Sequence, residues 1–370
     1  PSNNGISHFL EHMLFKGTKT RTAQDIAESF DSIGGQINAF TSKEYTCLYA
    51  RVLDNHKEYA IEVLSDMFFN STFDEVEIER EKKVVLEEIK MYEDTPDDIV
   101  HDLLAKASYG DHPLGFPILG TEETVNSFTR DMLIDYYQKQ YTPEHVVVSV
   151  AGNVDPSFIE TIEKYFDCFT TKGEAQPLEK PTILANQLKR HKDTEQAHLC
   201  IGYQGLALDD EDIFSLIMIN NVLGGSMSSR LFQEIREKEG LAYSVFSYHS
   251  SFLDHGLLTI YAGTGVEQLP YVQDKIDEIV TQFVEKGITD KELMNSKEQL
   301  KGNMVLGLES TNSRMSRNGK NELLLNRHRS LDEMIQAIEA VNQESIQRVM
   351  EKTFASPPSS AVIIPKEASH

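Results

Sequence analysis

The 370-residue sequence has few cysteines, no long apolar segment and no excess of positive charge. Its three cysteines, Cys47, Cys168 and Cys200, are odd in number and far apart, and none has the C-x-x-C spacing of a structural zinc site. Disulfide frameworks are denser and even-numbered, so we expect three reduced packing residues in a cytoplasmic protein. The sequence therefore excludes a small disulfide-stabilised domain.

No run of apolar residues approaches the roughly 18 that a membrane-spanning helix needs. Lysine and arginine number 35 against 59 aspartates and glutamates, which gives a formal net charge of −24. This acidity disfavours non-specific binding to nucleic acids. An acidic chamber would favour basic peptides as ligands, and the alternative is the acidity of a generally acidic proteome. We expect neither a membrane nor a nucleic acid as a partner.

Near its start the sequence has an H-x-x-E-H motif formed by His8, Glu11 and His12. In a helix, residues four apart lie on one face, so His8 and His12 can hold one zinc ion. Glu11 borders the same face, where a carboxylate can take a proton from a water molecule at the metal. This order of residues is typical of inverted zinc peptidases, although an amphipathic helix can carry it by chance.

A catalytic zinc usually has three protein ligands, so a third one is needed. Residues 77–90 contain no glycine or proline, and their apolar positions predict a helix. Glu81 and Glu88 are seven residues apart and share a face of that helix, whereas Glu87 points about 100° away. The alternative for such acids is a solvated helix face.

Residues 4–18 closely resemble the pitrilysin/insulinase family of zinc metallopeptidases, in particular its short branch with mitochondrial processing peptidase and its bacterial relatives. The resemblance implies that His8, His12 and Glu88 bind one Zn²⁺ per chain, because Glu88 follows His12 by the 76 residues found in that branch. It also implies that Glu81 supports the site from outside the ligand set and that Glu11 is the general base.

Residues 34–46 resemble the family's edge strand beside the zinc, on which substrate lies as an added strand. The residues that this resemblance assigns to substrate binding are Gly35, Asn38, Ala39, Phe40 and Thr41. The alternative is an ordinary hairpin after a Gly-Gly turn.

Residues 223–243 resemble a segment of the family's second domain whose Arg and Tyr reach the substrate, here Arg236 and Tyr243. A phenol can donate to the oxyanion of peptide hydrolysis, and an arginine can hold a substrate carbonyl. Without the resemblance, Arg236 would be interpreted as a solvated helix residue and Tyr243 as a half-buried strand residue.

The polar, proline-containing residues 170–187 predict a linker between a metal-binding domain, 1–169, and a second domain, 188–370. The two halves are similar at an offset of 213 residues at 129–150 and 342–363. The start of the Glu88 helix at Phe73 likewise parallels Ile288, and this match, with an offset of 215, sets Asn303 where the first half has Glu88. Only the first half can therefore bind the metal.

Each half alternates strands with long helices, which indicates a mixed helix and sheet fold. The family resemblance implies an α+β fold of two duplicated α/β sandwich domains, each a mainly antiparallel sheet with helices packed on it. Family members have roughly forty to fifty residues before the motif. We therefore expect the N-terminal strands of the first domain, and any targeting segment, to be missing from this chain.

The motif and the family resemblance together imply a zinc endopeptidase that cleaves unfolded peptides or presequence-like segments in a chamber formed by two subunits of a homodimer. Arg236 and Tyr243 would serve the zinc site of the partner subunit. The alternative is a non-catalytic structural or docking subunit of the same fold. A purely structural zinc site would lack a fourth protein ligand in the motif region.

Overall fold

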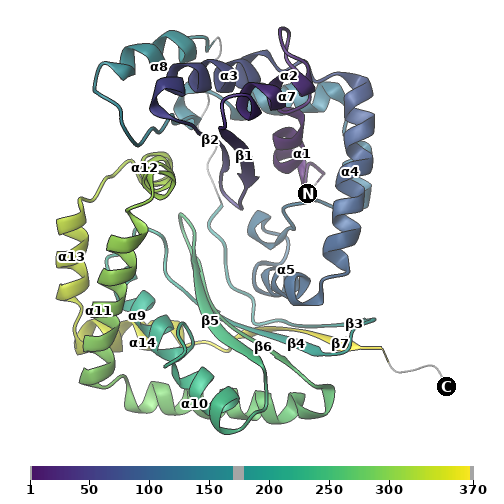
Figure 1. Cartoon of the computed structure of the whole chain (residues 1–370). Coiled ribbons are helices and arrows are strands. Elements are labelled where there is room, and N and C mark those ends of the chain that lie inside the picture. Colours follow the sequence, from purple (N-terminus) through teal and green to yellow (C-terminus); the bar gives the residue numbers. More distant parts are fainter. Residues whose placement is uncertain (1, 170–178, 367–370) are drawn as a thin grey trace. The chain divides into compact units, whose positions relative to one another are not determined.

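The computed structural model of the chain describes residues 2–169 and 179–366. These residues form two compact units (Figure 1). The first unit contains the described residues of 1–91, 116–178 and 308–328, and the second contains those of 92–115, 179–307 and 329–370. Mixed helix and mainly antiparallel sheet confirm the predicted α+β class.

The elements of the first unit are mostly helices. They are α1 (Ile6–Met13), α2 (Ala23–Asp31), β1 (Gln36–Thr41), β2 (Thr46–Arg51), η1 (Asp54–His56), α3 (Lys57–Asn70), α4 (Glu75–Glu93), α6 (Glu122–Ser127), α7 (Arg130–Gln140), η3 (Pro143–His145), α8 (Phe158–Phe166) and α12 (Thr311–Leu325). The last two residues of α4 belong to the second unit.

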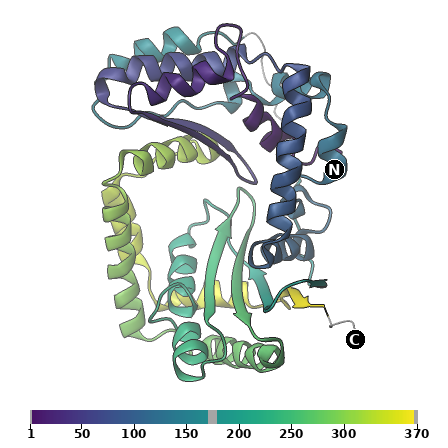
Figure 2. The ribbon, with the colours of Figure 1, turned by 45° about the vertical axis from the view of Figure 1, so that its right-hand side comes forward.

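Helices α2 and α3 pack on the antiparallel hairpin β1–β2 (Figure 2, purple). Ile26 and Phe30 of α2 and Met67 of α3 are almost fully buried there and pack against Ile37 of β1 and Leu48 of β2. A second core joins α1, α4 and α7. Its fully buried residues include Phe9, Leu10, Met13, Val85, Val125, Phe128 and Leu133.

The second unit is built on one sheet with helices on both faces. Its elements are α5 (Pro96–Tyr109), η2 (Pro113–Gly115), β3 (Gln187–Lys192), β4 (Ala197–Gln204), α9 (Ile213–Leu223), η4 (Phe232–Lys238), β5 (Ser244–Ser251), β6 (Gly256–Thr264), η5 (Val266–Gln268), α10 (Leu269–Lys286), α11 (Asp290–Gly307), α13 (Leu331–Ala340), α14 (Gln343–Thr353) and β7 (Ser359–Pro365). The strand order is β3-β7-β4-β6-β5, and among these described strands only β3 and β7 pair in parallel.

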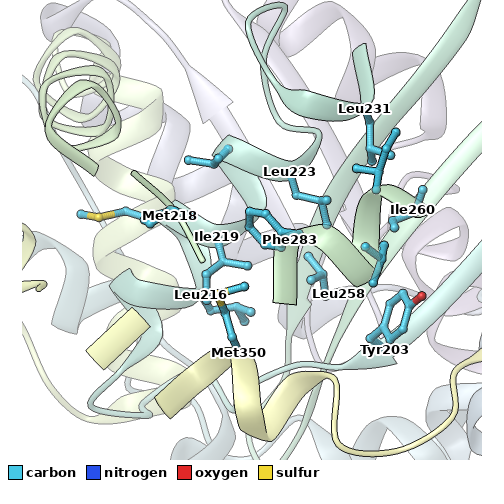
Figure 3. Packing of buried hydrophobic residues seen from close by; sticks show 14 of the residues in the cluster. Tyr203, Leu216, Met218, Ile219, Leu223, Leu231, Leu258, Ile260, Phe283 and Met350 are labelled. Atoms are coloured by element: carbon cyan, nitrogen blue, oxygen red, sulfur yellow. The ribbon is translucent and has the colours of Figure 1, made fainter. Parts of the chain in front are cut away.

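Alternating side chains of the central strands enter two different cores. Leu199 and Ile201 of β4 pack with α9, α10 and α14, in the cluster around Phe283 shown in Figure 3. Cys200 of β4 and Tyr261 of β6 pack on the other face with α5. Because both faces are covered, β4 and β6 are buried along nearly their whole length.

Two helices support the predicted duplication. Helix α7 begins after the N-cap Thr129 and α14 begins after Asn342, and each cap side chain accepts a hydrogen bond from the backbone amide three residues later. The two caps are the residues that the 213-residue offset aligns. The offset thus aligns the starts of two helices as well as similar residues.

The compact units differ from the predicted domains in two segments, each of which belongs to the other unit. Residues 92–115 belong to the second unit because α5 packs on β7 and β4, and residues 308–328 belong to the first, where Ser149 Oγ donates to the Met315 carbonyl at 2.7 Å. Residues 170–178 of the predicted linker lie outside the described residues. The boundaries at 169 and 188 stay a prediction about the order of the homologous halves.

The cysteines are free thiols, as expected, but only Cys200 is buried. Cys47 is partly buried and Cys168 is exposed, so the expectation of three packing residues is wrong for Cys168. In the described part of the chain, no helix combines the length and the apolar character that crossing a membrane requires.

Candidate metal centre

Helix α1 presents His8, Glu11 and His12 on one side while its other residues anchor it. Phe9, Leu10 and Met13 are at most 1% exposed in the core beneath α1, so the helix cannot rotate without exposing them. The helix starts at Gly5, whose φ is 86° and whose Cα faces the backbone of residues 119–120 so closely that a Cβ would lie 2.7 Å from Gly120 Cα. A side chain at this position would displace α1.

Helix α4 brings Glu88 to the two imidazoles. Ile78 and Val85 bury one side of α4, and Glu81 and Glu88 both face the α1 histidines. Val84, which the apolar pattern placed near the buried stripe, is half exposed because the stripe follows positions 78 and 85, seven residues apart.

Three possible ligand atoms form a compact triangle. His8 Nε2 and His12 Nε2 are 3.2 Å apart, and Glu88 Oε2 lies 3.7 Å from the first and 3.6 Å from the second. In the described part of the chain this is the one cluster of three or more such groups that could hold a metal ion. The structure therefore brings together the three residues predicted as ligands, which stand up to 80 positions apart in the sequence.

The donor set fits zinc. Bonds of about 2.0–2.1 Å in a tetrahedral site separate neighbouring ligand atoms by about 3.3 Å, which is close to the three edges observed. Two imidazole nitrogens and one carboxylate oxygen are ligands that zinc accepts, and three protein ligands leave one coordination position open.

The two histidines have different proton affinities. Burial, with a smaller contribution from the charge of His12, lowers the pKa of His8 to about 4, so that its ring is neutral at pH 7, as a metal ligand must be. Burial also lowers the pKa of His12, but its hydrogen bond to Glu81 and the nearby carboxylates of Glu81, Glu88 and Glu11 outweigh burial and raise it.

Glu81 orients His12 from behind. Its Oε1 lies 2.8 Å from His12 Nδ1 and its Oε2 lies 2.7 Å from Lys16 Nζ. Burial raises the pKa of Glu81, but the hydrogen bonds from His12 and Lys16 hold it below its usual range, and the residue is 3% exposed. An ionised Glu81 accepts a hydrogen bond from the N–H at His12 Nδ1. The lone pair of His12 Nε2 is then available to bind a metal ion. The structure thus places Glu81 where the resemblance put a supporting acid.

Sequence reasoning did not single out Lys16. Its ammonium group neutralises the buried Glu81 carboxylate, which would otherwise be costly to keep ionised. The available signal was its position inside the recognised stretch 4–18, four residues after His12.

Glu11 lies beside the three-atom triangle and is not one of its members. It is 9% exposed, and the Thr41 hydroxyl donates a short hydrogen bond to its Oε2. Burial raises the pKa of Glu11 above its ordinary value, while the hydrogen bond from Thr41 and the charge of His12 oppose the shift. The geometry separates one carboxylate from the ligand set, as the motif predicts.

The predicted substrate strand is β1, with Gly35 immediately before it. Asn38 and Phe40 are exposed, while Ala39 and Thr41 are partly buried. β1 pairs with β2 on one edge, and within residues 2–169 and 179–366 no strand pairs with its other edge. The structure therefore contains both the ordinary hairpin of the alternative interpretation and a free strand edge on β1, as a substrate strand requires.

Arg236 and Tyr243 belong to the second unit, whereas the histidine and glutamate cluster belongs to the first. Arg236 lies in η4, which is a π-helix and not the ordinary helix that the sequence suggested. Its guanidinium carbon is 4.7 Å from the ring centre of Phe232 and 4.6 Å from that of Tyr243. The exposed Tyr243 and the guanidinium border a cavity of about 300 Å³ that also includes Gly224.

Known proteins resemble the chain over its full length. Residues 1–122 match the model of the insulinase family, peptidase family M16, and residues 127–300 match that of the peptidase M16 inactive domain. An uncharacterised zinc protease of Bacillus subtilis, YmxG, is 61% identical, with 99% of this chain and 89% of the relative aligned. One from Streptomyces coelicolor is 43% identical, over 100% of this chain and 83% of the relative.

Solved structures show the same fold. A peptidase M16 inactive domain from Pseudomonas fluorescens superposes with a TM-score of 0.91 at 21% identity, over 100% of this chain and 90% of that one. A protease from Helicobacter pylori gives 0.88 at 23% identity, over 99% and 90%. The chain is a member of the insulinase, or M16, peptidase family. Its assignment to the processing-peptidase branch stays a prediction.

Proposed function

We propose that the chain is a zinc-dependent endopeptidase in which His8, His12 and Glu88 hold one zinc ion per chain. The observation that carries this proposal is the triangle of ligand atoms, with edges of 3.2 to 3.7 Å, beside a buried carboxylate outside it. The name zinc protease given to the relatives in Bacillus subtilis and Streptomyces coelicolor supports it.

Bound zinc supplies a Lewis acid that lowers the pKa of water and polarises a peptide carbonyl. Glu11 accepts the proton of the attacking water at its carboxylate and later delivers a proton to the leaving amine. Its burial supports this role, because a pKa above the ordinary carboxyl value brings the base closer to neutral pH. Glu81 holds the His12 ring in place during these proton transfers.

In this proposal the peptide lies along the free edge of β1. Backbone hydrogen bonds to an edge strand recognise any extended chain, so the substrate must be unfolded locally. The amide of Ala39 donates to its neighbour Asn38 Oδ1 at 2.8 Å. Ser42 and Tyr45 form a hydrogen-bonded pair, so the alternation of antiparallel pairs directs the Ala39 amide away from β2. An arriving peptide carbonyl can replace Asn38 as its acceptor.

Arg236 and Tyr243 complete the site in our proposal. Tyr243 is 79% exposed, and its phenol can donate to an oxyanion. The guanidinium of Arg236 can hold a substrate carbonyl. We place both residues at the zinc site of the partner subunit in a homodimer, where they close a chamber that admits unfolded, preferably basic, peptides. A cytoplasmic location stays a prediction.

Cleavage of an unfolded, basic peptide tests this function. We expect cleavage by the wild-type chain, loss of cleavage with a zinc chelator, and recovery when zinc is added back. Glu11→Gln should lower kcat by at least about 100-fold because an amide cannot accept the proton. Glu87→Gln is the matched control, since Glu87 is exposed and pairs only on the surface with Lys90 at 2.6 Å.

Cleavage that withstands both the chelator and Glu11→Gln would contradict the proposal. A wild-type chain that binds zinc and cleaves no peptide would support the alternative of a non-catalytic subunit.

A further inference from the structure

The last residue of β1 touches the candidate general base. Thr41 faces Thr46, the first residue of β2, as its cross-strand partner, and their hydroxyl oxygens are 3.2 Å apart. The Thr41 hydroxyl also contacts Glu11 Oε2. A turn closes the hairpin beyond them, with the Ser42 amide donating to the Tyr45 carbonyl at 2.8 Å. The hydroxyls of Thr46 and Thr41, from adjacent strands, thus form consecutive contacts that end at the Glu11 carboxylate.

The number of available protons determines which group donates in each of these two hydrogen bonds. An ionised carboxylate only accepts, and each hydroxyl has one proton to donate. Thr41 therefore gives its proton to Glu11 Oε2 and accepts one from Thr46. Oε2 therefore accepts the hydrogen bond from Thr41, which fixes the orientation of the Glu11 carboxylate.

Thr41 also belongs to the strand on which we place the peptide. Its backbone is the end of β1, whose free edge is the proposed substrate edge, and its side chain contacts Glu11. Any displacement of the edge strand therefore moves the hydroxyl that fixes the base. This link matters because a misplacement of about 1 Å between reacting groups can cost about 100-fold in rate.

We propose that Thr41 is a positioning residue that fixes the Glu11 carboxylate relative to a peptide bound along β1, with Thr46 holding the Thr41 hydroxyl in turn. The inference rests on the proposed function for its consequence in catalysis. Thr41 touches Glu11 and, among the described contacts, none of His8, His12 and Glu88. It therefore acts on the base and not on the metal.

Thr41→Val tests the proposal, because valine keeps the β-branched shape that suits a strand and removes only the hydroxyl. We expect kcat to fall about 10- to 100-fold while KM changes less than about twofold. Thr41→Ser, which restores a hydroxyl, should recover kcat to within about threefold of the wild type. Thr46→Val, one step further from Glu11, should reduce kcat by less than Thr41→Val.

Zinc affinity and unfolding provide readouts other than activity. Zinc affinity should be equal in the wild type and Thr41→Val. Thermal unfolding of the metal-free wild type, Thr41→Val, Glu11→Gln and the double variant forms a double-mutant cycle, and we expect non-additive shifts of the midpoint because the two residues are in contact. Additive shifts, or an unchanged kcat in Thr41→Val, would overturn the positioning role.

The two proposals fail in different ways. A wild-type chain without peptidase activity overturns the proposed function and the catalytic consequence of Thr41 together. In that case a coupled unfolding cycle would still establish that Thr41 holds Glu11. If the wild type is active and Thr41→Val cleaves equally well, the zinc peptidase stands and only the inference about Thr41 falls.

Discussion

At the scale of single residues, His12 is held from two sides. Its Nδ1 faces Glu81 at 2.8 Å, and its Nε2 faces His8 Nε2 at 3.2 Å and Glu88 Oε2 at 3.6 Å. The first contact fixes the tautomer that the second requires. Glu81 is itself fixed by Lys16. His8 and Lys16, together with Glu81 and Glu88 two turns apart on α4, therefore determine where a single nitrogen points.

Glu81→Gln should weaken zinc binding by about 10- to 100-fold, because a neutral amide orients the His12 ring less firmly and leaves Lys16 without its carboxylate. The measurement is competition for zinc against a coloured chelator. Glu87→Gln, a surface change on the same helix, is the control and should bind zinc like the wild type. Equal affinity in all three proteins would show that Glu81 has no supporting role.

The sequence predicts some of these residues better than others. The spacing of His8, Glu11 and His12 is enough to place them on one helix face. Periodicity puts Glu81 and Glu88 together on a second face, but only the family resemblance directs that face toward the histidines. The contacts of Lys16 with Glu81 and of Thr41 with Glu11 join different elements, and no local pattern predicts such contacts.

At the scale of elements, the segment after α1 is fastened to α3 by one carboxylate. Asp66 accepts hydrogen bonds from Thr18, Thr20 and Arg21 of that segment and from Asn70 of its own helix. Burial raises the pKa of Asp66, but these four donors outweigh burial and lower it. The ionised form is therefore bound more tightly by the folded chain than by the unfolded one.

Asp66→Asn should lower the free energy of unfolding at pH 7 by about 2–3 kcal/mol, since it removes hydrogen bonds to a buried charge. A pKa lowered by folding stabilises the chain above the pKa of the unfolded state, and this contribution is lost as pH falls through the folded-state value. The difference between wild type and variant should thus shrink below about pH 4. Urea unfolding at pH 7 and pH 3 measures it, and a difference independent of pH would contradict the explanation.

Helix and strand types were predictable to different degrees. The stretch around His8 to His12, the stretch around Glu88 and the strand after Gly35 form the elements that their patterns predict. The π-helix around Arg236 was not foreseen, because its residues have ordinary helix propensities and no local pattern in them indicates a wider turn. Within this turn the guanidinium carbon of Arg236 lies 4.7 Å from the ring centre of Phe232, four positions away.

At the scale of the whole molecule, the chain consists of two compact units that exchange segments. The duplication stays a prediction, and the repeated helix starts at Thr129 and Asn342 support it. The exchange of residues 92–115 and 308–328 was not visible, because it depends on which sheet α5 packs against and on contacts such as that between Ser149 and Met315. Each of these two segments lies in one half of the sequence but packs in the compact unit formed mainly by the other half.

The proposed homodimer makes a prediction at this scale. Glu11→Gln removes the base of one subunit and Tyr243→Phe removes the phenol that we assign to its partner. Each variant alone should be inactive, whereas a mixture refolded together should regain activity, because one of the two sites in a mixed dimer is then intact. No recovery above either parent would contradict the shared site.

The central claim is that His8, His12 and Glu88 bind one zinc ion. Titration of the metal-free chain with zinc tests it most directly, with Glu88→Gln compared to Glu87→Gln one position away on the same helix. We predict one zinc per chain for the wild type and for Glu87→Gln, and an affinity at least about 100-fold lower for Glu88→Gln, which lacks one of three ligands. Equal zinc binding by the three proteins, or no binding by any, would contradict the claim.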